Sequence, residues 1–192
     1  MPNLYIISGC NGAGKTTASY NILPEILNCK EFVNADEIAK GLSPFQPEKV
    51  SLEAGRIMLE RIEDLLRIKA DFAFETTLST RSYVNTVKRA KESGYEVTLL
   101  YFWLNSQELA IERVKERVRE GGHNIPEQVI RRRYNKGIKN LINLFIPVVG
   151  NWLVIDNSEN PFLTVAEGQQ GENMIIHDKN IWNRIIEISN GQ

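Results

Sequence analysis

Residues 4–17 read LYIISGCNGAGKTT, and this stretch decides the fold. An apolar run precedes a glycine-rich turn, a lysine and two threonines. Gly9 to Thr16 fits the spacing G-x-x-x-x-G-K-[ST], whose glycines let backbone N–H groups turn inward around phosphate oxygens. A strand-like run before the loop and a helix-capable segment after it are the context that this motif requires. The stretch therefore predicts a P-loop that binds a nucleotide.

The motif also predicts a role for each of its side chains. Lys15 reaches the β and γ oxygens, and the Thr16 hydroxyl binds Mg²⁺, so we expect ATP or another NTP together with Mg²⁺. The expected nucleotide-binding residues of the loop are Gly9, Asn11, Gly12, Ala13, Gly14, Lys15, Thr16 and Thr17. Cys10 is expected to fill space, and a reactive thiol is the alternative.

The rest of the chain alternates apolar runs with amphipathic segments. Strands are expected at 4–8, 31–34, 72–75, 96–103 and 152–156, and helices at about 15–27, 47–69, 80–93, 107–120 and 127–145. The strand segments are mostly continuous apolar runs, as in strands covered on both faces. The pattern predicts an α/β fold with a doubly wound, parallel, five-stranded sheet.

The tail from about 161 to 190 reads differently. Segments 162–167 and 173–177 flank the sequence GQQG, which predicts a small C-terminal hairpin, and a last helix is expected near 181–188. No repeat or long linker divides the chain, so we expect a single domain over 1–192.

Composition limits the classes of function. The net charge of -1 gives no global attraction for nucleic acid, and no apolar run approaches the length of a membrane span. The P-loop starts within ten residues of Met1, which is unlike a signal peptide, and the two cysteines lack metal-site or disulfide spacing. We expect a cytoplasmic protein without nucleic-acid or membrane partners.

Two carboxylates follow expected strands. Asp36 in NADEIA and Glu75 in FAFETTLST would project toward the crevice at the carboxyl ends of the strands, where ligands collect. Phosphoryl transfer to a hydroxyl needs a carboxylate that takes its proton, and Asp36 is the expected base. Alternatively, Asp36 or Asn34 caps a short helix that starts near Glu37. Glu75 would orient Mg²⁺ through water or hold the acceptor, or be a helix-start charge.

A third acid, Asp156, ends the apolar run WLVID and resembles the aspartate of a magnesium-binding strand. Because it follows the last parallel strand, we interpret residues 156–158 as a turn that borders the nucleotide base. The aromatic run 101–103 is expected to be sheet core.

Segment 113–139 is rich in arginine and predicts two helices joined by a turn. Such a hairpin is suited to close over the triphosphate as a lid, with arginines that neutralise charge on the transferred group. The candidate lid arginines are Arg113, Arg117, Arg131, Arg132 and Arg133. The alternative is a solvated hairpin whose glutamates pair with them. His123 is expected to be a turn residue.

Together, GCNGAGKTT, NADEIA, FAFETTLST, RVKERVREGGHNIPEQVIRRRY and WLVIDNS resemble the zeta toxin-like P-loop kinases, from Leu4 to about Ser158. The resemblance implies the strand order 2-3-1-4-5. Known zeta toxins phosphorylate the 3′-hydroxyl of UDP-N-acetylglucosamine with an NTP, and many are inhibited by a small antitoxin that blocks the nucleotide site.

Carried over by motif, the resemblance implies catalytic roles for Asp36, Lys15, Arg117 and Arg133, with Arg113 and Arg132 at the nucleotide. It places Asp36, Glu75, Thr77 and Thr80 at the acceptor. The chain is shorter than the well-known toxins, and Thr76 stands where a glycine is common. These departures leave the acceptor open. A nucleoside or polynucleotide kinase, and a nucleotide-gated binding module with slow hydrolysis, are the alternatives.

Overall fold

The central strand of the sheet is the apolar run that precedes the P-loop. The computed structural model describes residues 1–122 and 124–191. Its strands are β1 (Asn3–Gly9), β2 (Phe32–Val33), β3 (Phe72–Thr76), β4 (Glu96–Trp103), β5 (Asn151–Asp156), β6 (Leu163–Gln169) and β7 (Ile175–Ile176). β1 pairs in parallel with β3 on one side and with β4 on the other. Strands β1 to β5 therefore have the order 2-3-1-4-5, as expected.

The five expected parallel strands are present, and the hairpin adds two more, so the sheet has seven strands among the described residues. β6 pairs antiparallel with β5, and β7 pairs antiparallel with β6, so the C-terminal hairpin extends the sheet. Val165 and Ala166 of β6 are fully buried, and this burial holds the hairpin against the domain. The sequence predicts the hairpin correctly. The pairing of this hairpin with β5 depends on tertiary packing, which a local sequence pattern does not predict.

Seven α-helices are described. They are α1 (Lys15–Asn21), α2 (Ala35–Leu42), α3 (Ser51–Arg67), α4 (Ser82–Glu92), α5 (Gln107–Arg119), α6 (Glu127–Asn140) and α7 (Lys179–Asn190). Six occupy the expected helical segments, and α2 is the short helix near Glu37 that the sequence suggests as an alternative. π-helical segments continue α1 over Ile22–Ile26 and α6 over Leu141–Phe145, and a 3-10 turn at Pro47–Val50 leads into α3. These segments explain why the helices predicted from the sequence at 15–27, 47–69 and 127–145 are longer than α1, α3 and α6.

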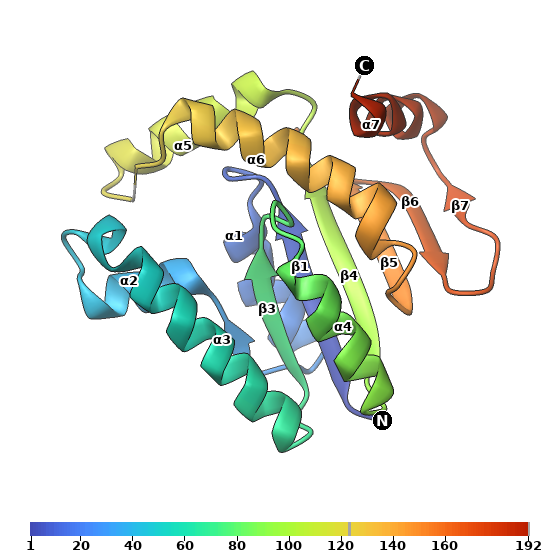
Figure 1. The fold of residues 1–192 in the computed structure, drawn as a ribbon. Helices are drawn as coiled ribbons and strands as arrows, with labels where there is room; N and C mark the ends of the chain where they lie inside the picture. The colour runs from blue at the N-terminus through green and yellow to red at the C-terminus, as the bar shows by residue number, and fades with distance from the viewer. Residues whose placement is uncertain (123, 192) are drawn as a thin grey trace.

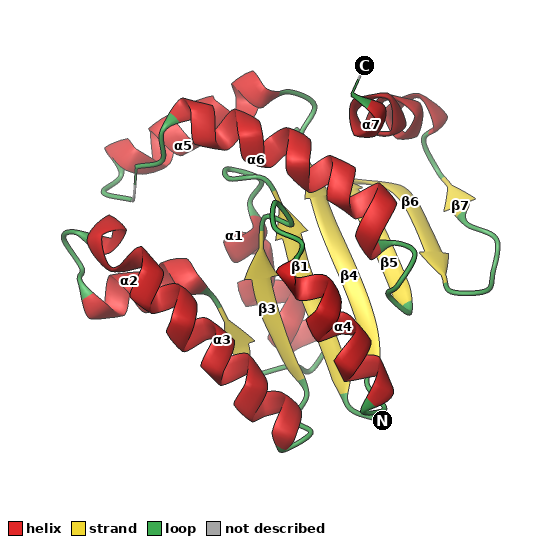
Figure 2. Cartoon of the chain, viewed as in Figure 1, coloured by secondary structure: helices red, strands yellow, loops and turns green. Residues whose placement is uncertain are grey.

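The helices cover both faces of the sheet. In Figure 1, α3 and α4 lie in front of the strands and α1 lies behind them. Figure 2 shows α5 and α6 across the ends of the strand arrows, above the P-loop. Leu4, Phe72 and Phe74 are fully buried, as expected for strands covered on both faces. The aromatic run 101–103 is also buried, which confirms that it is core.

Candidate active site

A cleft of about 770 Å³ opens at the carboxyl ends of β1 and β3, beneath the α5–α6 hairpin. It brings together most of the site residues expected from the sequence, from segments that lie far apart in the chain. These lining residues are Asn11, Gly12, Gly14, Lys15, Thr16, Thr17, Asp36, Glu75, Thr77, Thr80, Arg113, Arg117 and Arg133. The P-loop, the two carboxylates and three candidate lid arginines thus share one cleft.

Two glycines of the P-loop are required by its geometry. Gly9 has φ +142°, and a Cβ there would lie 2.2 Å from the backbone oxygen of Phe102 on β4. Gly14 has φ +78°, and a Cβ there would lie 2.6 Å from Nδ2 of Asn157. Both positions combine a left-handed conformation with a close neighbour, so any side chain would distort the loop.

Lys15 and Thr16 converge on Glu75. The Lys15 Nζ donates to the Cys10 carbonyl at 2.9 Å and lies 3.4 Å from Oε1 of Glu75. The Thr16 hydroxyl donates to Oε2 of Glu75 at 2.7 Å. Lys15 is 6% exposed, and a buried ammonium needs such partners. Glu75 therefore orients the two P-loop side chains that the motif assigns to phosphate and Mg²⁺.

Asn34 is a member of this cluster that the sequence suggests only as a helix cap. Its Oδ1 accepts from the backbone N–H groups of Asp36 and Glu37, so it does cap α2. Its Nδ2 donates to Oε2 of Glu75 at 2.8 Å. One side chain thus ties the start of α2, which carries Asp36, to the carboxylate beside the P-loop. The available signal is the position of Asn34 directly after a strand, two residues before Asp36.

Arg133 of α6 reaches the P-loop from above. Its Nη1 donates to Oδ1 of Asn11 at 3.2 Å. Burial lowers the pKa of the Arg133 guanidinium, and the charge of the Asp36 carboxylate opposes that shift. Arg133 and Asp36 therefore attract each other across the cleft.

Arg113 of α5 is bound to the turn after β5. Its Nη1 and Nη2 donate to the carbonyls of Asn157 and Ser158, both at 2.8 Å. The Asp156 carboxylate accepts from the backbone N–H and the hydroxyl of Ser158, which confirms the turn at 156–158.

Three expected nucleotide-binding residues lie outside the lining of the cleft. Gly9 is at the end of β1, and the carbonyl of Ala13 accepts from Asn157. The side chain of Arg132 is exposed on α6. Arg131, a further lid candidate, donates to Gln107 and Glu108 of α5 and thereby joins the two lid helices. The expectation for His123 lies outside the described residues.

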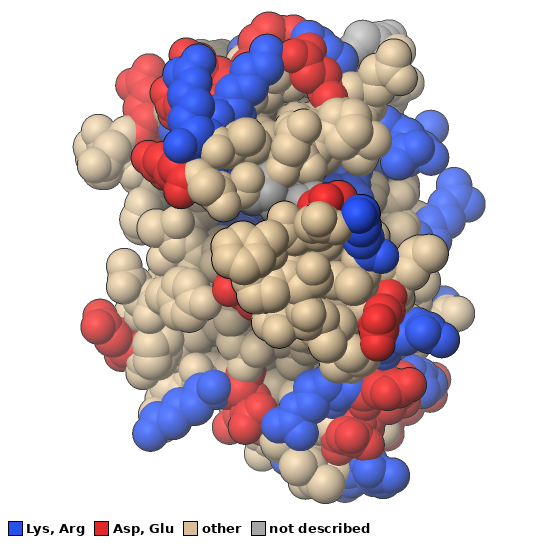
Figure 3. Space-filling model, turned by 90° about the vertical axis from the view of Figure 1, so that its left-hand side faces the viewer, with Lys and Arg blue, Asp and Glu red and all other residues tan. Residues whose placement is uncertain are grey.

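The other half of the cleft has a different lining. Thr77 and Ser79 share a hydrogen bond of 2.9 Å, and Thr80 and Ser82 share one of 3.1 Å. The same half of the cleft is lined by apolar and aromatic side chains of α3 and α4 and by one arginine. These residues are Leu52, Arg56, Met58, Leu59 and Tyr83. Figure 3, viewed from the side of α2 and α3, shows a broad uncharged area in the middle of this face.

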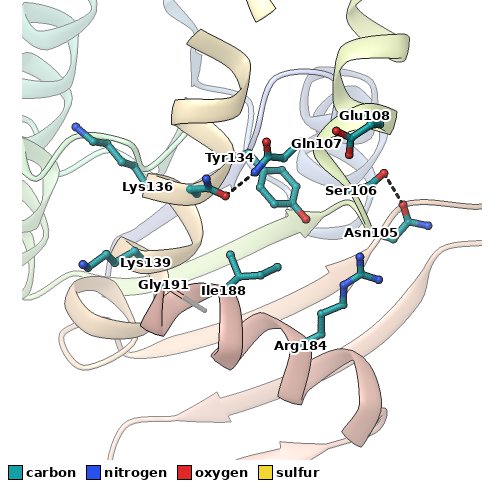
Figure 4. A pocket seen from close by; sticks show the side chains of 11 residues that line it. Asn105, Ser106, Gln107, Glu108, Tyr134, Lys136, Lys139, Arg184, Ile188 and Gly191 are labelled. Carbon is teal, nitrogen blue, oxygen red and sulfur yellow. Dashed lines mark hydrogen bonds between the residues drawn. The ribbon is translucent and has the colours of Figure 1, made fainter. Parts of the chain in front are cut away.

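A second hollow, of about 560 Å³, lies between the start of α5, α6 and α7, and its lining contains no P-loop residue. Figure 4 shows Arg184 of α7 directed toward Asn105, just before the start of α5, while Lys136 and Lys139 extend from α6. Tyr134 donates its hydroxyl to the Leu104 carbonyl at 2.7 Å. Helix α6 therefore lines two hollows, and Lys136 and Lys139 line the one without the P-loop.

The thiol of Cys10 is buried within the P-loop. Burial raises its pKa to about 11, so the thiol stays protonated at neutral pH. This favours the filling role over the reactive one.

The donor set around Thr16 fits a magnesium ion. A hydroxyl and a carboxylate oxygen are the hard ligands that Mg²⁺ prefers, together with phosphate oxygens of its nucleotide. Among the described residues, no three His, Cys, Asp or Glu side chains gather into a site for a metal ion. The arrangement thus suits a metal that arrives with the nucleotide.

Comparison with known proteins agrees with this geometry. The sequence profile of the zeta toxin family matches residues 1–145, which include the P-loop, both carboxylates and the lid helices. The chain belongs to the zeta toxin family. An uncharacterised protein of Haemophilus influenzae is 34% identical over 128 residues, which cover 66% of this chain and 88% of that protein.

Solved structures show the same fold at low identity. A chain of the AvrRxo1-ORF1:AvrRxo1-ORF2 complex with sulphate ions superposes with a TM-score of 0.77 at 20% identity, over 96% of this chain. This protein spans only 63% of that chain's length. A chain of the PezAT toxin–antitoxin system of Streptococcus pneumoniae has a TM-score of 0.65 at 15% identity, over 100% of this chain and 85% of that one. Family and fold together support a phosphotransferase of the P-loop kinase type.

None of the helices in the described part of the chain is both long and apolar enough to cross a membrane.

Proposed function

We propose that this protein transfers the γ-phosphate of ATP, or of another NTP, to a hydroxyl group of a small molecule. A sugar nucleotide such as UDP-N-acetylglucosamine is the acceptor we propose first. One observation carries the proposal: the P-loop, Asp36 and Arg133 face a single cleft that has a second, hydroxyl-rich half. Simple nucleotide binding needs no such second half.

Each residue has a role that follows from its place. Lys15 and the P-loop amides hold the phosphates, and Arg133, within reach of Asn11, neutralises charge that develops on the transferred group. Asp36 accepts the proton of the acceptor hydroxyl. Bound Mg²⁺ would neutralise β and γ oxygens, and Thr16 with Glu75 would hold it there.

The acceptor would lie between the hydroxyl groups and the apolar wall. Thr77 and Thr80 offer hydrogen bonds to sugar hydroxyls, and Leu59 offers apolar surface. Arg56, which lines the same half of the cleft, would meet a diphosphate. We also propose an antitoxin partner, because the neighbours from AvrRxo1 and PezAT are named as complexes or systems of two proteins.

The test follows ATP turnover with Mg²⁺, with and without UDP-N-acetylglucosamine, and detects phosphorylated sugar nucleotide by mass. We expect a product in the wild type and a loss of about 10²- to 10⁴-fold in Asp36→Asn, which removes the base but retains its size. The affinity for ATP, measured by calorimetry, should be unchanged in this variant.

The other outcomes separate the alternatives. ADP formation without a product from UDP-N-acetylglucosamine would leave the kinase and redirect the search to nucleosides, 5′-hydroxyl ends of nucleic acids and other sugars. Tight ATP binding without transfer to any of these would support a nucleotide-gated binding module.

A further inference from the structure

Asn157 connects the P-loop to two distant parts of the chain. Its backbone N–H donates to the Trp103 carbonyl at 3.0 Å and extends the pairing of β5 with β4. Its side-chain Nδ2 donates to the Ala13 carbonyl at 2.9 Å, across 144 positions in the sequence. Its own carbonyl accepts from Arg113. The same residue thus contacts the sheet, the P-loop and α5.

The bond to Ala13 determines how one peptide of the P-loop is oriented. In a trans peptide the C=O group and the following N–H group point in opposite directions. With the Ala13 carbonyl directed at Asn157, the N–H of Gly14 points away from Asn157, toward the concave side of the loop. The loop amides that point to this side are the ones that bind phosphate oxygens.

Only a residue without a side chain leaves room at position 14 for this contact. The φ of +78° at Gly14 and the 2.6 Å from its ideal Cβ position to Nδ2 of Asn157 show that the amide is packed against the backbone itself. Asn157 cannot drift, because its carbonyl and that of Ser158 are both held by the Arg113 guanidinium. Because the backbone of Asn157 is anchored on both sides, its side chain is able to hold the peptide that it contacts.

We propose that Asn157 is a positioning residue of the P-loop, whose amide holds the Ala13–Gly14 peptide so that the Gly14 N–H faces the phosphates. The inference rests on the proposed nucleotide binding and adds to it a residue from the opposite end of the domain. Asn157 acts through Gly14. The turn at 156–158, which is expected to border the base, is held by the backbone groups of Asn157, so adenosine binding does not depend on the side-chain bond to Ala13.

The test compares the affinities of Asn157→Ala and wild type for ATP and for adenosine, each measured by calorimetry. We expect the affinity for ATP to fall about 3- to 10-fold, since one hydrogen bond that orders the loop is lost, with the affinity for adenosine unchanged. Asn151→Ala is the matched control: this asparagine of β5 also donates one side-chain hydrogen bond, to Glu96, far from the P-loop. It should leave both affinities unchanged.

A second variant covers the case in which Asn157→Ala does not fold. Asn157→Ser retains a polar side chain in the turn but is too short to reach Ala13, so the same selective loss is expected. Equal losses for ATP and adenosine, or no loss for ATP, would overturn the inference and leave nucleotide binding intact. A wild type that binds no ATP would instead overturn the proposed function.

Discussion

The two halves of the cleft are built in different ways. In the phosphate half, Lys15, Thr16 and Asn34 all reach Glu75, a residue far from each of them in the sequence. In the acceptor half, the bonds between hydroxyls join residues two positions apart, Thr77 to Ser79 and Thr80 to Ser82. Longer-range bonds are present there too: the Tyr83 hydroxyl donates to Sδ of Met58, and Asn140 of α6 donates to the Leu78 carbonyl. The phosphate half is therefore fixed by the fold. The acceptor half combines hydroxyls that bond locally with exposed side chains of α3, and these exposed side chains can change without altering the sheet.

The difference shows which half of the cleft tolerates substitutions. Nucleotide phosphates are the same whatever the acceptor is, so a half preorganised by buried polar contacts suits them. Leu52 is 87% exposed and Leu59 is 46% exposed, so these two residues of the acceptor wall contribute little to the core and are able to vary, whereas Met58 behind them is buried. The predictions below test this contrast, from the largest expected effect to the smallest.

Lys15→Ala should have the largest effect, because it removes the buried cation that meets the phosphates. We expect phosphoryl transfer to fall about 10²- to 10³-fold. The measurement is the initial rate of ADP formation in the presence of acceptor. Lys136→Ala, a lysine of α6 that lines the other hollow, is the control and should retain the wild-type rate. Equal rates for both variants would contradict the preorganised phosphate half.

Asn34→Asp separates the two tasks of Asn34. Aspartate caps a helix as well as asparagine does, so the melting temperature should hold. The new carboxylate would face Glu75, and a like charge raises the pKa of one member of the pair. We expect turnover to fall about tenfold. Its acidic limb should move to higher pH, since activity that needs an ionised carboxylate beside Lys15 and Thr16 is lost as pH falls through the raised pKa.

Asn34→Ala is the companion variant. It loses the cap as well, which should cost about 1 kcal/mol and lower the melting temperature by about 2–4 °C. If Asn34→Asp kept the wild-type pH profile, the bond to Glu75 would have no part in turnover.

Leu59→Ser should affect only the acceptor. Removal of apolar surface from the wall should raise the KM for the acceptor about 3- to 10-fold and leave the KM for ATP unchanged. Leu42→Ser is a matched control: Leu42 is 45% exposed, against 46% for Leu59, but does not line the cleft. A rise in both KM values would show that the halves are coupled.

The smallest effect is expected from thiol reagents. Cys10 and Cys29 are both buried, and burial raises the pKa of each thiol to about 11. At pH 8 both remain protonated, so iodoacetamide should label them only after unfolding, as followed by mass. Labelling of Cys10 in the native protein, with loss of ATP binding, would instead support the alternative that Cys10 has a reactive thiol.

The resemblance to a known family implied the strand order. The sequence by itself determined the P-loop, the parallel strands of the sheet and the carboxylates worth testing. These features depend on local requirements: left-handed glycines, continuous apolar strands and polar residues directly after strands. The match between expected and observed β4, both over 96–103, shows how strong a local signal a continuous apolar run can be.

Tertiary structure alone decided which polar groups meet. Glu75 contacts Lys15 and Thr16 because β3 lies beside β1, and Asn157 contacts Ala13 because β5 ends at the same edge of the sheet. The hairpin joins β5 because Val165 and Ala166 gain burial there. Such contacts depend on the relative positions of elements far apart in the chain. No local pattern of residues encodes those positions, since they arise only when the whole core packs.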